Sequence, residues 1–221
     1  MTALVLPTGP SEGDGDIFTR IIKSIEKQGY IVLDNAFPEE VLSRLFVYLK
    51  DINKDEFHPA GVGRANGFQI NEFTRRDRIC WLEKGPDETQ SYFEWIETLR
   101  QRINRDLFLG LFDYECHFAH YPKGAFYKKH VDAFKGQSNR RLSTILYLNP
   151  QWNVKDGGEL AMYQPSVAEP FINVEPVWGR VVIFLSEVFP HEVLPASRSR
   201  YSLTGWYRVN ATIGENLDPP K

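Results

Sequence analysis

Strand-like runs follow one another through the second half of the chain, and this order of elements limits the possible folds most strongly. The runs are short, rich in β-branched and aromatic residues, and separated by turn signals. They span residues 114–121, 142–148, 159–163, 180–185 and 200–209. The first half contains helical patterns instead. Helices followed by many strands predict a mainly β fold with N-terminal helices, built as a β-sandwich or a jelly-roll barrel.

The helical patterns lie at residues 17–28, 38–52 and 89–107, and each has apolar residues on one face. Gly29 is the expected stop of the first helix, and residues 30–34 read as a strand. Residues 53–78 sustain no period and contain three glycines among charges, which favours a mobile loop that covers an active site. We expect a mobile leader at 1–16, a single domain at 17–210 and a tail at 211–221.

Composition narrows the function classes. A chain of 221 residues suits one domain, and its net charge of −3 gives no electrostatic reason to bind nucleic acid. A local basic patch is nevertheless present, made of Lys128, Lys129, Lys135, Arg140 and Arg141. The two cysteines, Cys80 and Cys116, are expected to be reduced thiols in or near the core. No signal peptide and no apolar run of ~20 residues is present, so we expect a cytoplasmic protein without a membrane partner.

Two histidines and an aspartate are the candidate metal ligands. His130 and Asp132 stand two apart, so an extended chain places both side chains on one face, where they can meet one ion. His191, which follows the run 180–185, is the candidate third ligand. Two imidazoles and one carboxylate form the facial ligand set of non-haem iron(II) oxygenases, which leaves three coordination positions open. Zinc accepts the same ligands, and each histidine taken alone is also compatible with a surface or turn position.

Arg200 opens the last strand-like run. With a period of two it shares a face with Thr204 and Trp206, and we assign this face to the barrel interior. An arginine inside a small barrel is costly unless it meets an anion. Its guanidinium offers a dicarboxylate a bidentate partner, and the Thr204 hydroxyl can add a hydrogen bond. The alternative is an ion pair with Glu159 or Glu187.

Several stretches of the chain, taken together, carry a family resemblance. They are Arg75–Trp81, His120–Pro122, Tyr127–Asp132, Leu146–Asn149, Gly157–Leu160, Pro190–Val193 and Arg200–Trp206. From about residue 30 to residue 209 the chain resembles the prolyl 4-hydroxylases of the hypoxia-inducible-factor type and their bacterial relatives. The His-x-Asp tripeptide alone is typical only of the wider iron(II)/2-oxoglutarate oxygenase superfamily, whereas the set of stretches is much more specific.

The resemblance implies a double-stranded β-helix core and a chemistry. The expected reaction is oxidative decarboxylation of 2-oxoglutarate to succinate and CO2, coupled to hydroxylation at C4 of a prolyl residue. It implies Fe(II), 2-oxoglutarate and O2 as cofactors, with ascorbate as the reductant. The expected partner is a protein that presents an exposed proline. Elongation factor Tu is the target of the known bacterial relatives, which makes it a candidate here.

The resemblance also assigns roles to further residues. Tyr147 corresponds to the tyrosine that joins the arginine on the distal carboxylate of 2-oxoglutarate. The apolar walls of the co-substrate slot correspond to Ile145, Leu160 and Val193. The residues around the target proline correspond to Tyr121, Tyr127, Arg140 and Trp206. Asp77 and Arg140 correspond to a pair that ties the mobile loop to the core. Taken alone, the tyrosines and Trp206 are equally compatible with ordinary packing.

The sequence differs from the resembled family in two places, and it leaves three alternative functions open. The stretch 121–130 is shorter than in the animal enzymes, and the loop at 53–78 shares little with theirs. Both features concern substrate choice, so the resemblance implies the chemistry more strongly than the protein target. A small-molecule oxygenase acting on a free amino acid would need a fixed charge pair for the zwitterion. A nucleic-acid demethylase would carry a second arginine at the position of Trp206. A non-catalytic sensor module would keep the fold, but all three ligands and Arg200 are intact.

Overall fold

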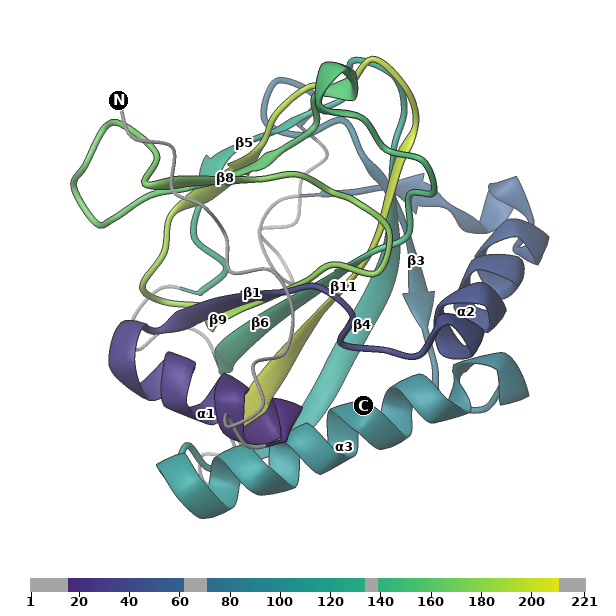
Figure 1. Cartoon of the computed structure of the whole chain (residues 1–221). Helices are drawn as coiled ribbons and strands as arrows, with labels where there is room; N and C mark the ends of the chain where they lie inside the picture. Colours follow the sequence, from purple (N-terminus) through teal and green to yellow (C-terminus); the bar gives the residue numbers. More distant parts are fainter. Residues whose placement is uncertain (1–15, 62–70, 134–138, 211–221) are drawn as a thin grey trace, which may run out of the picture.

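Two antiparallel sheets face each other in the computed structural model, which describes residues 16–61, 71–133 and 139–210 (Figure 1). The larger sheet has seven strands in the order β1-β9-β6-β11-β4-β3-β2, and the smaller sheet has four in the order β5-β10-β7-β8. Three α-helices, α1, α2 and α3, belong to the N-terminal half. The chain therefore has the expected mainly β jelly-roll fold with N-terminal helices.

The elements have the following bounds. The helices are α1 (Ile17–Gln28), α2 (Glu39–Asp51) and α3 (Asp87–Leu107), with short 3-10 turns at Lys54–Glu56 and Val154–Asp156. The larger sheet contains β1 (Tyr30–Leu33), β2 (His58–Pro59), β3 (Arg78–Leu82), β4 (Leu111–Tyr121), β6 (Arg140–Tyr147), β9 (Val181–Leu185) and β11 (Arg200–Val209). The smaller sheet contains β5 (Tyr127–His130), β7 (Leu160–Met162), β8 (Ile172–Val174) and β10 (His191–Val193).

The first helix shows how local sequence fixes an element's ends. The Asp16 carboxylate accepts a hydrogen bond from the Thr19 backbone N–H at 2.8 Å and so caps the N-terminus of α1. Gly29 ends the helix in the left-handed conformation at φ 80°, which favours glycine. A Cβ on Gly29 would also lie 3.0 Å from the Phe189 ring. Asp16, the last residue of the leader expected at 1–16, is therefore the N-cap of α1.

The larger sheet buries a core on each of its faces. On the outer face, Leu203 and Tyr207 of β11 pack in the core that the helices cover, and Figure 1 shows α1 and α3 across this side of the sheet. On the inner face, Ile145 and Tyr147 of β6 pack in a second core, to which the smaller sheet contributes Leu160. Within β6, Leu146 packs in the core that the helices cover, whereas Ile145 and Tyr147 pack in the inner core. Alternate residues of one strand thus enter different cores, as the period of two requires.

The long elements confirm the sequence predictions, whereas most of the short strands were not predicted. The helix predicted at 17–28 has these bounds, and the other two helices and the five strand-like runs agree within three residues. The strands β3, β5, β8 and β10 were not predicted as strands. Three of them have only three or four residues, too few to sustain a period, and their pairing partners decide their conformation.

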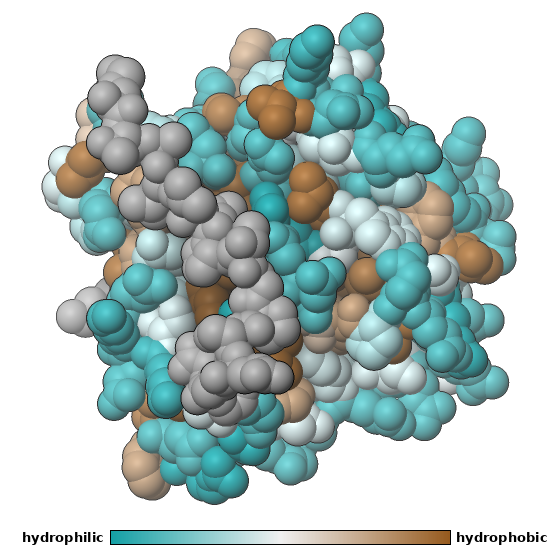
Figure 2. Space-filling view, in the orientation of Figure 1, coloured by the Kyte–Doolittle hydropathy of each residue, from teal (hydrophilic) through white to brown (hydrophobic). Residues whose placement is uncertain are grey.

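Some expectations concern residues outside the described part of the chain. These are the leader up to residue 15, the tail at 211–221, the loop section 62–70 and Lys135 of the basic patch. Within the described part, Cys80 and Cys116 are free thiols, as expected. No helix there is both long enough and apolar enough to cross a membrane. The face shown in Figure 2 is largely hydrophilic, with hydrophobic side chains in small separate groups.

Candidate active site

The three predicted metal ligands converge between the two sheets. His130 ends β5, Asp132 follows it, and His191 begins the neighbouring strand β10, directly opposite His130 in the pairing register. One oxygen of Asp132, Oδ1, lies 3.5 Å from His130 Nε2 and 3.6 Å from His191 Nε2. The three ligand atoms lie within 4.8 Å of one another, which is close enough to hold one ion.

Backbone carbonyls fix the orientation of both imidazoles. His130 Nδ1 lies 2.8 Å from the Lys128 carbonyl oxygen, and His191 Nδ1 lies 3.0 Å from the Phe189 carbonyl oxygen. A carbonyl only accepts, so each Nδ1 carries the proton and each Nε2 keeps a lone pair for a metal. Burial, followed by the charge of His130, lowers the pKa of His191 to about 4, so His191 is neutral at pH 7.

The carboxylate of Asp132 is buried but remains ionised. Burial raises its pKa, but the interactions with His191, His130 and the Ser143 hydroxyl outweigh this effect and hold the pKa well below its usual range. Ser143 donates a hydrogen bond of 2.6 Å to Oδ2, the oxygen that does not face the histidines. Two imidazoles with an ionised carboxylate are the donor set of a facial iron(II) site, and these residues fit that ion.

Arg200 is buried in the barrel interior, with only 1% of its surface exposed. Its Nε donates to the Gly158 carbonyl at 2.9 Å, and its Cζ lies 5.0 Å from the ring centroids of Tyr121 and Tyr147. Among the described residues, no carboxylate pairs with it. The alternative of an ion pair with Glu187 is wrong, because that carboxylate pairs with Arg141 at 3.1 Å instead.

The surroundings of Arg200 fit a carboxylate of a bound molecule. The Tyr147 hydroxyl is buried and has no hydrogen-bond partner among the described residues. Burial raises the pKa of Tyr147, so this hydroxyl stays protonated and can donate. Gly158 (φ 75°) leaves the space that Arg200 needs, since a Cβ there would lie 3.3 Å from Arg200 Cδ and 2.9 Å from the Ala196 Cβ. A buried cation with an unpaired donor beside it is costly unless an anion joins them.

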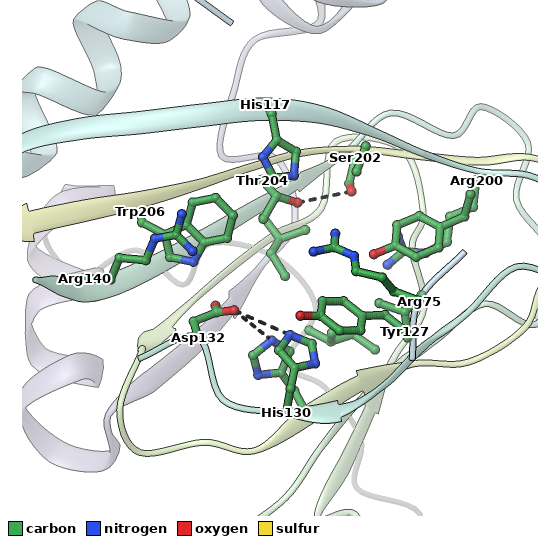
Figure 3. A pocket seen from close by; sticks show the side chains of 16 residues that line it. Arg75, His117, Tyr127, His130, Asp132, Arg140, Arg200, Ser202, Thr204 and Trp206 are labelled. Atoms are coloured by element: carbon green, nitrogen blue, oxygen red, sulfur yellow. Dashed lines mark hydrogen bonds and ion pairs between the residues drawn. The ribbon is translucent and has the colours of Figure 1, made fainter. Parts of the chain in front are cut away.

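One pocket of about 80 Å³ connects the ligands to Arg200 (Figure 3). In Figure 3, His130 and Asp132 lie on one side and His117, Thr204 and Ser202 lie on the opposite side. The three expected apolar walls all line this pocket: Ile145, Leu160 and Val193. Thr204 lines it as well, as predicted from the period of two on β11. The structure therefore brings the predicted metal ligands, Arg200, Thr204 and the apolar walls to one cavity, whereas Tyr147 packs against Arg200 without lining that cavity.

The residues expected around the target proline divide between the two ends of this cavity. The Tyr127 ring stacks on the His130 ring, with 3.6 Å between centroids. Trp206 lines the cavity beneath the Arg140 guanidinium, whose Cζ lies 3.6 Å from the Trp206 ring. Tyr121 instead packs against Arg200, so it lies at the co-substrate end rather than beside Tyr127 and Trp206.

The expected pair between Asp77 and Arg140 is not formed, and this is a correction. Both oxygens of Asp77 accept from Arg75, at 2.7 and 2.6 Å. Arg140 donates through Nε and Nη2 to one oxygen of Glu115, at 2.9 and 2.7 Å. Arg75 stands two residues from Asp77 in the sequence and pairs with it. Glu115 lies in the same sheet as Arg140 and pairs with that guanidinium.

Sequence reasoning missed three residues of the site: Arg75, His117 and Ser143. His117 is buried, lines the pocket and has an unpartnered Nδ1 among the described residues. Burial, followed by the charges of Arg75 and Arg140, lowers its pKa to about 3. The period of two could have found it, because His117 shares a face of β4 with Tyr121. No local signal pointed to the Ser143 contact with Asp132.

Arg75 closes the pocket over Tyr127. Its Cζ lies 4.1 Å from the Tyr127 ring centroid, and its Nη1 donates to the Gly61 carbonyl at 3.2 Å. The backbone of this segment also pairs with β5, where the Lys128 N–H donates to the Thr74 carbonyl at 2.9 Å. The last residues of the predicted loop are thus bound to the smaller sheet in this structure.

Comparisons with known proteins agree with this geometry. Residues 116–208 match the 2OG-Fe(II) oxygenase superfamily. A solved prolyl-4-hydroxylase of Pseudomonas putida is 38% identical, with a TM-score of 0.79, over 88% of this chain and 100% of that chain. A prolyl hydroxylase of Trichoplax adhaerens, solved with a hypoxia inducible factor oxygen degradation domain peptide fragment, is 25% identical, with a TM-score of 0.73, over 86% and 88% of the two chains.

Among curated sequences, human Egl nine homolog 1 is 38% identical over 196 residues, which cover 85% of this chain and 45% of the human protein. The chain spans about half the length, or less, of several of the curated relatives that it matches. The family match at residues 116–208 includes the three candidate metal ligands and Arg200.

Proposed function

The chain belongs to the 2OG-Fe(II) oxygenase superfamily and to its prolyl hydroxylases, and from this premise we propose that it is a peptidyl-proline 4-hydroxylase. The family uses Fe(II), 2-oxoglutarate and O2. The proposed reaction converts 2-oxoglutarate to succinate and CO2 and places one oxygen atom on C4 of a prolyl residue. Ascorbate is the proposed reductant.

One observation carries the proposal: a single pocket holds the His–Asp–His cluster on one side and, at one end, an arginine that has no carboxylate partner among the described residues. The cluster can bind one ion, and Arg200 with the Tyr147 hydroxyl can bind one carboxylate. A 2-oxo dicarboxylic acid has a metal-chelating end and a distal carboxylate, so it matches both ends of this pocket.

The described residues have distinct tasks in this proposal. His130, Asp132 and His191 hold the iron, and their hydrogen bonds to carbonyls and to Ser143 keep the ligand atoms aimed at it. Arg200 and Tyr147 donate to the distal carboxylate, and Thr204 can add a further hydrogen bond. The apolar walls exclude water from the chelated end of the co-substrate. Bound iron, 2-oxoglutarate and O2 together supply the oxidising chemistry.

The substrate end of the pocket favours a prolyl ring. Tyr127 and Trp206 are flat aromatic walls near the metal cluster, and they suit a pyrrolidine ring better than a charged side chain. Proline sits readily at exposed turns, so a protein can offer it without breaking a helix or a sheet. We propose that Arg140 and the basic residues near it read the residues that flank the proline.

A protein target is supported by the relatives, one of which was solved with a peptide fragment. Elongation factor Tu is our first candidate substrate. The rival substrate, a free amino acid, would need a charge pair to hold its zwitterion. Arg75 lines the pocket, but two hydrogen bonds pair it with Asp77, so these two charges neutralise each other rather than a bound zwitterion.

The test is to incubate the protein with Fe(II), 2-oxoglutarate, ascorbate and either elongation factor Tu or a cell lysate, and to map added oxygen by mass spectrometry. We expect oxygen on a prolyl residue, and none with the Asp132→Ala variant. Oxygen on another amino acid, with every proline unmodified, would keep the oxygenase assignment and reject the prolyl one. Turnover of 2-oxoglutarate that responds only to free amino acids would favour the small-molecule rival.

A further inference from the structure

We propose that Ser143 is a positioning residue: its hydroxyl fixes Asp132 so that only one carboxylate oxygen faces the metal, and it ties the ligand cluster to the larger sheet. This inference rests on the proposed metal site. It goes beyond the three ligands because it says how their geometry is held and which residue of the other sheet holds it.

The two oxygens of Asp132 have separate partners. Oδ1 faces the two imidazoles, 3.5 Å from His130 Nε2 and 3.6 Å from His191 Nε2. Oδ2 accepts the hydrogen bond from Ser143 Oγ at 2.6 Å. The Ser143 hydroxyl is the donor of this bond, so its proton points toward Oδ2. The carboxylate plane is thereby set by one bond that does not involve the ion.

A second buried hydroxyl sets the direction of the first. Ser143 Oγ also lies 2.8 Å from Ser186 Oγ, and both serines are completely buried. Since the Ser143 proton is committed to Asp132, Ser186 must donate to Ser143. The order of donation is therefore Ser186 to Ser143 to Asp132, and each hydroxyl hydrogen in this chain has one acceptor. A buried hydrogen-bond chain in which every donor is used is rigid.

This arrangement matters for how many coordination positions stay open. With Oδ2 occupied by Ser143, Asp132 offers the ion a single oxygen. A carboxylate whose second oxygen were released could turn and bind the ion through both oxygens. It would then occupy a position that the chelating co-substrate needs, because this site depends on three open positions beside its three protein ligands.

The same bond also joins the two sheets. His130 and His191 belong to β5 and β10 of the smaller sheet, whereas Ser143 and Arg200 belong to β6 and β11 of the larger sheet. In the larger sheet, Ser143 pairs in register with Trp206, on the strand that begins at Arg200. A co-substrate that bridges the ion and Arg200 needs a fixed distance between them. The contact between Ser143 and Asp132 holds the ligand cluster to the sheet that contains the anchor.

The simpler interpretation is that Ser143 only satisfies a buried carboxylate and contributes stability. A neighbouring residue provides a matched control for this interpretation. Thr144 is also buried, and its hydroxyl makes a 2.6 Å hydrogen bond to Tyr114 on the opposite face of β6. Thr144→Val removes a buried hydroxyl from the same strand without touching Asp132.

The experiment compares Ser143→Ala, Ser186→Ala and Thr144→Val with the wild-type protein, using Mn²⁺ as the probe for the iron site. Mn²⁺ affinity is measured by electron paramagnetic resonance of the free ion. The affinity for 2-oxoglutarate is measured with and without Mn²⁺, and thermal unfolding is measured without metal. Ser143→Thr, which keeps the hydroxyl, is the rescue variant.

We expect Ser143→Ala to weaken Mn²⁺ binding by about 10- to 100-fold, which is the usual effect of removing a hydrogen-bond partner of a metal ligand. It should also reduce the gain in 2-oxoglutarate affinity that Mn²⁺ gives the wild-type protein. Ser186→Ala should weaken Mn²⁺ binding less, and Ser143→Thr should restore it. Thr144→Val should lower the unfolding temperature and leave Mn²⁺ affinity unchanged.

Two results would overturn the inference. One is a Ser143→Ala variant that binds Mn²⁺ and 2-oxoglutarate as the wild type does. The other is a Thr144→Val variant that loses as much Mn²⁺ affinity as Ser143→Ala, since the loss would then follow stability. If the wild-type protein bound no Mn²⁺ and His191→Ala changed nothing, the metal site itself would be wrong. That outcome is distinct, because it appears without any change at Ser143.

Discussion

The two sheets differ in how they are built and in what they contribute to the site. The larger sheet has strands of up to 11 residues and buries a core on both faces, one of them covered by the helices. The smaller sheet has strands of three or four residues. Yet both histidines of the proposed metal site belong to the smaller sheet, and Arg200, the proposed anchor, belongs to the larger one.

This difference separates stability from metal binding. The larger sheet holds many more buried apolar side chains than the smaller one, so its substitutions should act first on the free energy of unfolding. The smaller sheet gains little from its own short strands, and a bound ion should hold its strands together. The following predictions test this division, from the largest expected effect to the smallest.

Substitution of a ligand should have the largest effect. We expect His191→Ala to lower 2-oxoglutarate turnover by more than about 100-fold. Loss of a residue that only hydrogen-bonds a metal ligand already lowers metal affinity or activity by about 10- to 100-fold. Mn²⁺ titration and succinate release measure the two losses. His130→Ala and Asp132→Ala should behave alike. Full turnover in any of the three variants would remove that residue from the ligand set.

Substitution of the anchor should affect the co-substrate and spare the metal. We expect Arg200→Ala to raise the KM for 2-oxoglutarate by about 10- to 100-fold, since hydrogen bonds to a charged group contribute about 1.5–3 kcal/mol. Arg200→Lys should have a milder effect, because lysine keeps the charge but lacks the planar fork. Mn²⁺ affinity should stay at the wild-type value. An unchanged KM in both variants would mean that another residue binds the distal carboxylate.

Added metal should stabilise the protein through the smaller sheet. At a free Mn²⁺ concentration 100 times its Kd, binding contributes about 2.7 kcal/mol. For a chain of this size, that gain raises the Tm by about 5–10 °C. Differential scanning calorimetry should show the rise in the wild type and in Arg200→Ala but not in His191→Ala. A rise of equal size in His191→Ala would place the ion elsewhere.

A change on the outer face of the larger sheet should affect stability alone. Tyr207 is completely buried, and its hydroxyl donates to the Ile96 carbonyl of α3 at 2.7 Å. We expect Tyr207→Phe to cost about 1 kcal/mol of unfolding free energy, the net value of one hydrogen bond. Denaturant unfolding measures this cost. Mn²⁺ affinity and the KM for 2-oxoglutarate should not change, and a change in either would contradict the division between the sheets.

The long elements of the fold were predictable from the sequence, since each carries its own periodic signal. The helix at Ile17–Gln28 has an apolar stripe, a cap at each end and a glycine in the left-handed conformation. The strand Arg200–Val209 is long enough for its alternation to place Arg200 and Thr204 on the pocket face. In both cases neighbouring residues in the sequence contain the information that decides the structure.

The short strands and the ion pairs were not predictable in the same way. The strand His191–Val193 exists because β5 and β7 pair with it on both sides. The partner of Asp77 depends on which guanidinium lies within hydrogen-bond distance in the folded chain. That guanidinium belongs to Arg75 and not to Arg140. Such choices depend on the positions of residues far apart in the sequence, and the periodicity of one segment does not contain them.

The sequence by itself determined the helices, the long strands, the types of the candidate ligands and the inward face of Arg200. Only the tertiary structure decided that His117 lines the pocket, that Arg200 has no carboxylate partner in the described part of the chain, and that Ser143 holds Asp132. The physical reason is the range of the interactions. Side-chain direction within one element follows from local geometry, whereas a contact such as that between Ser143 and Asp132 requires two sheets to pack at one distance and in one register.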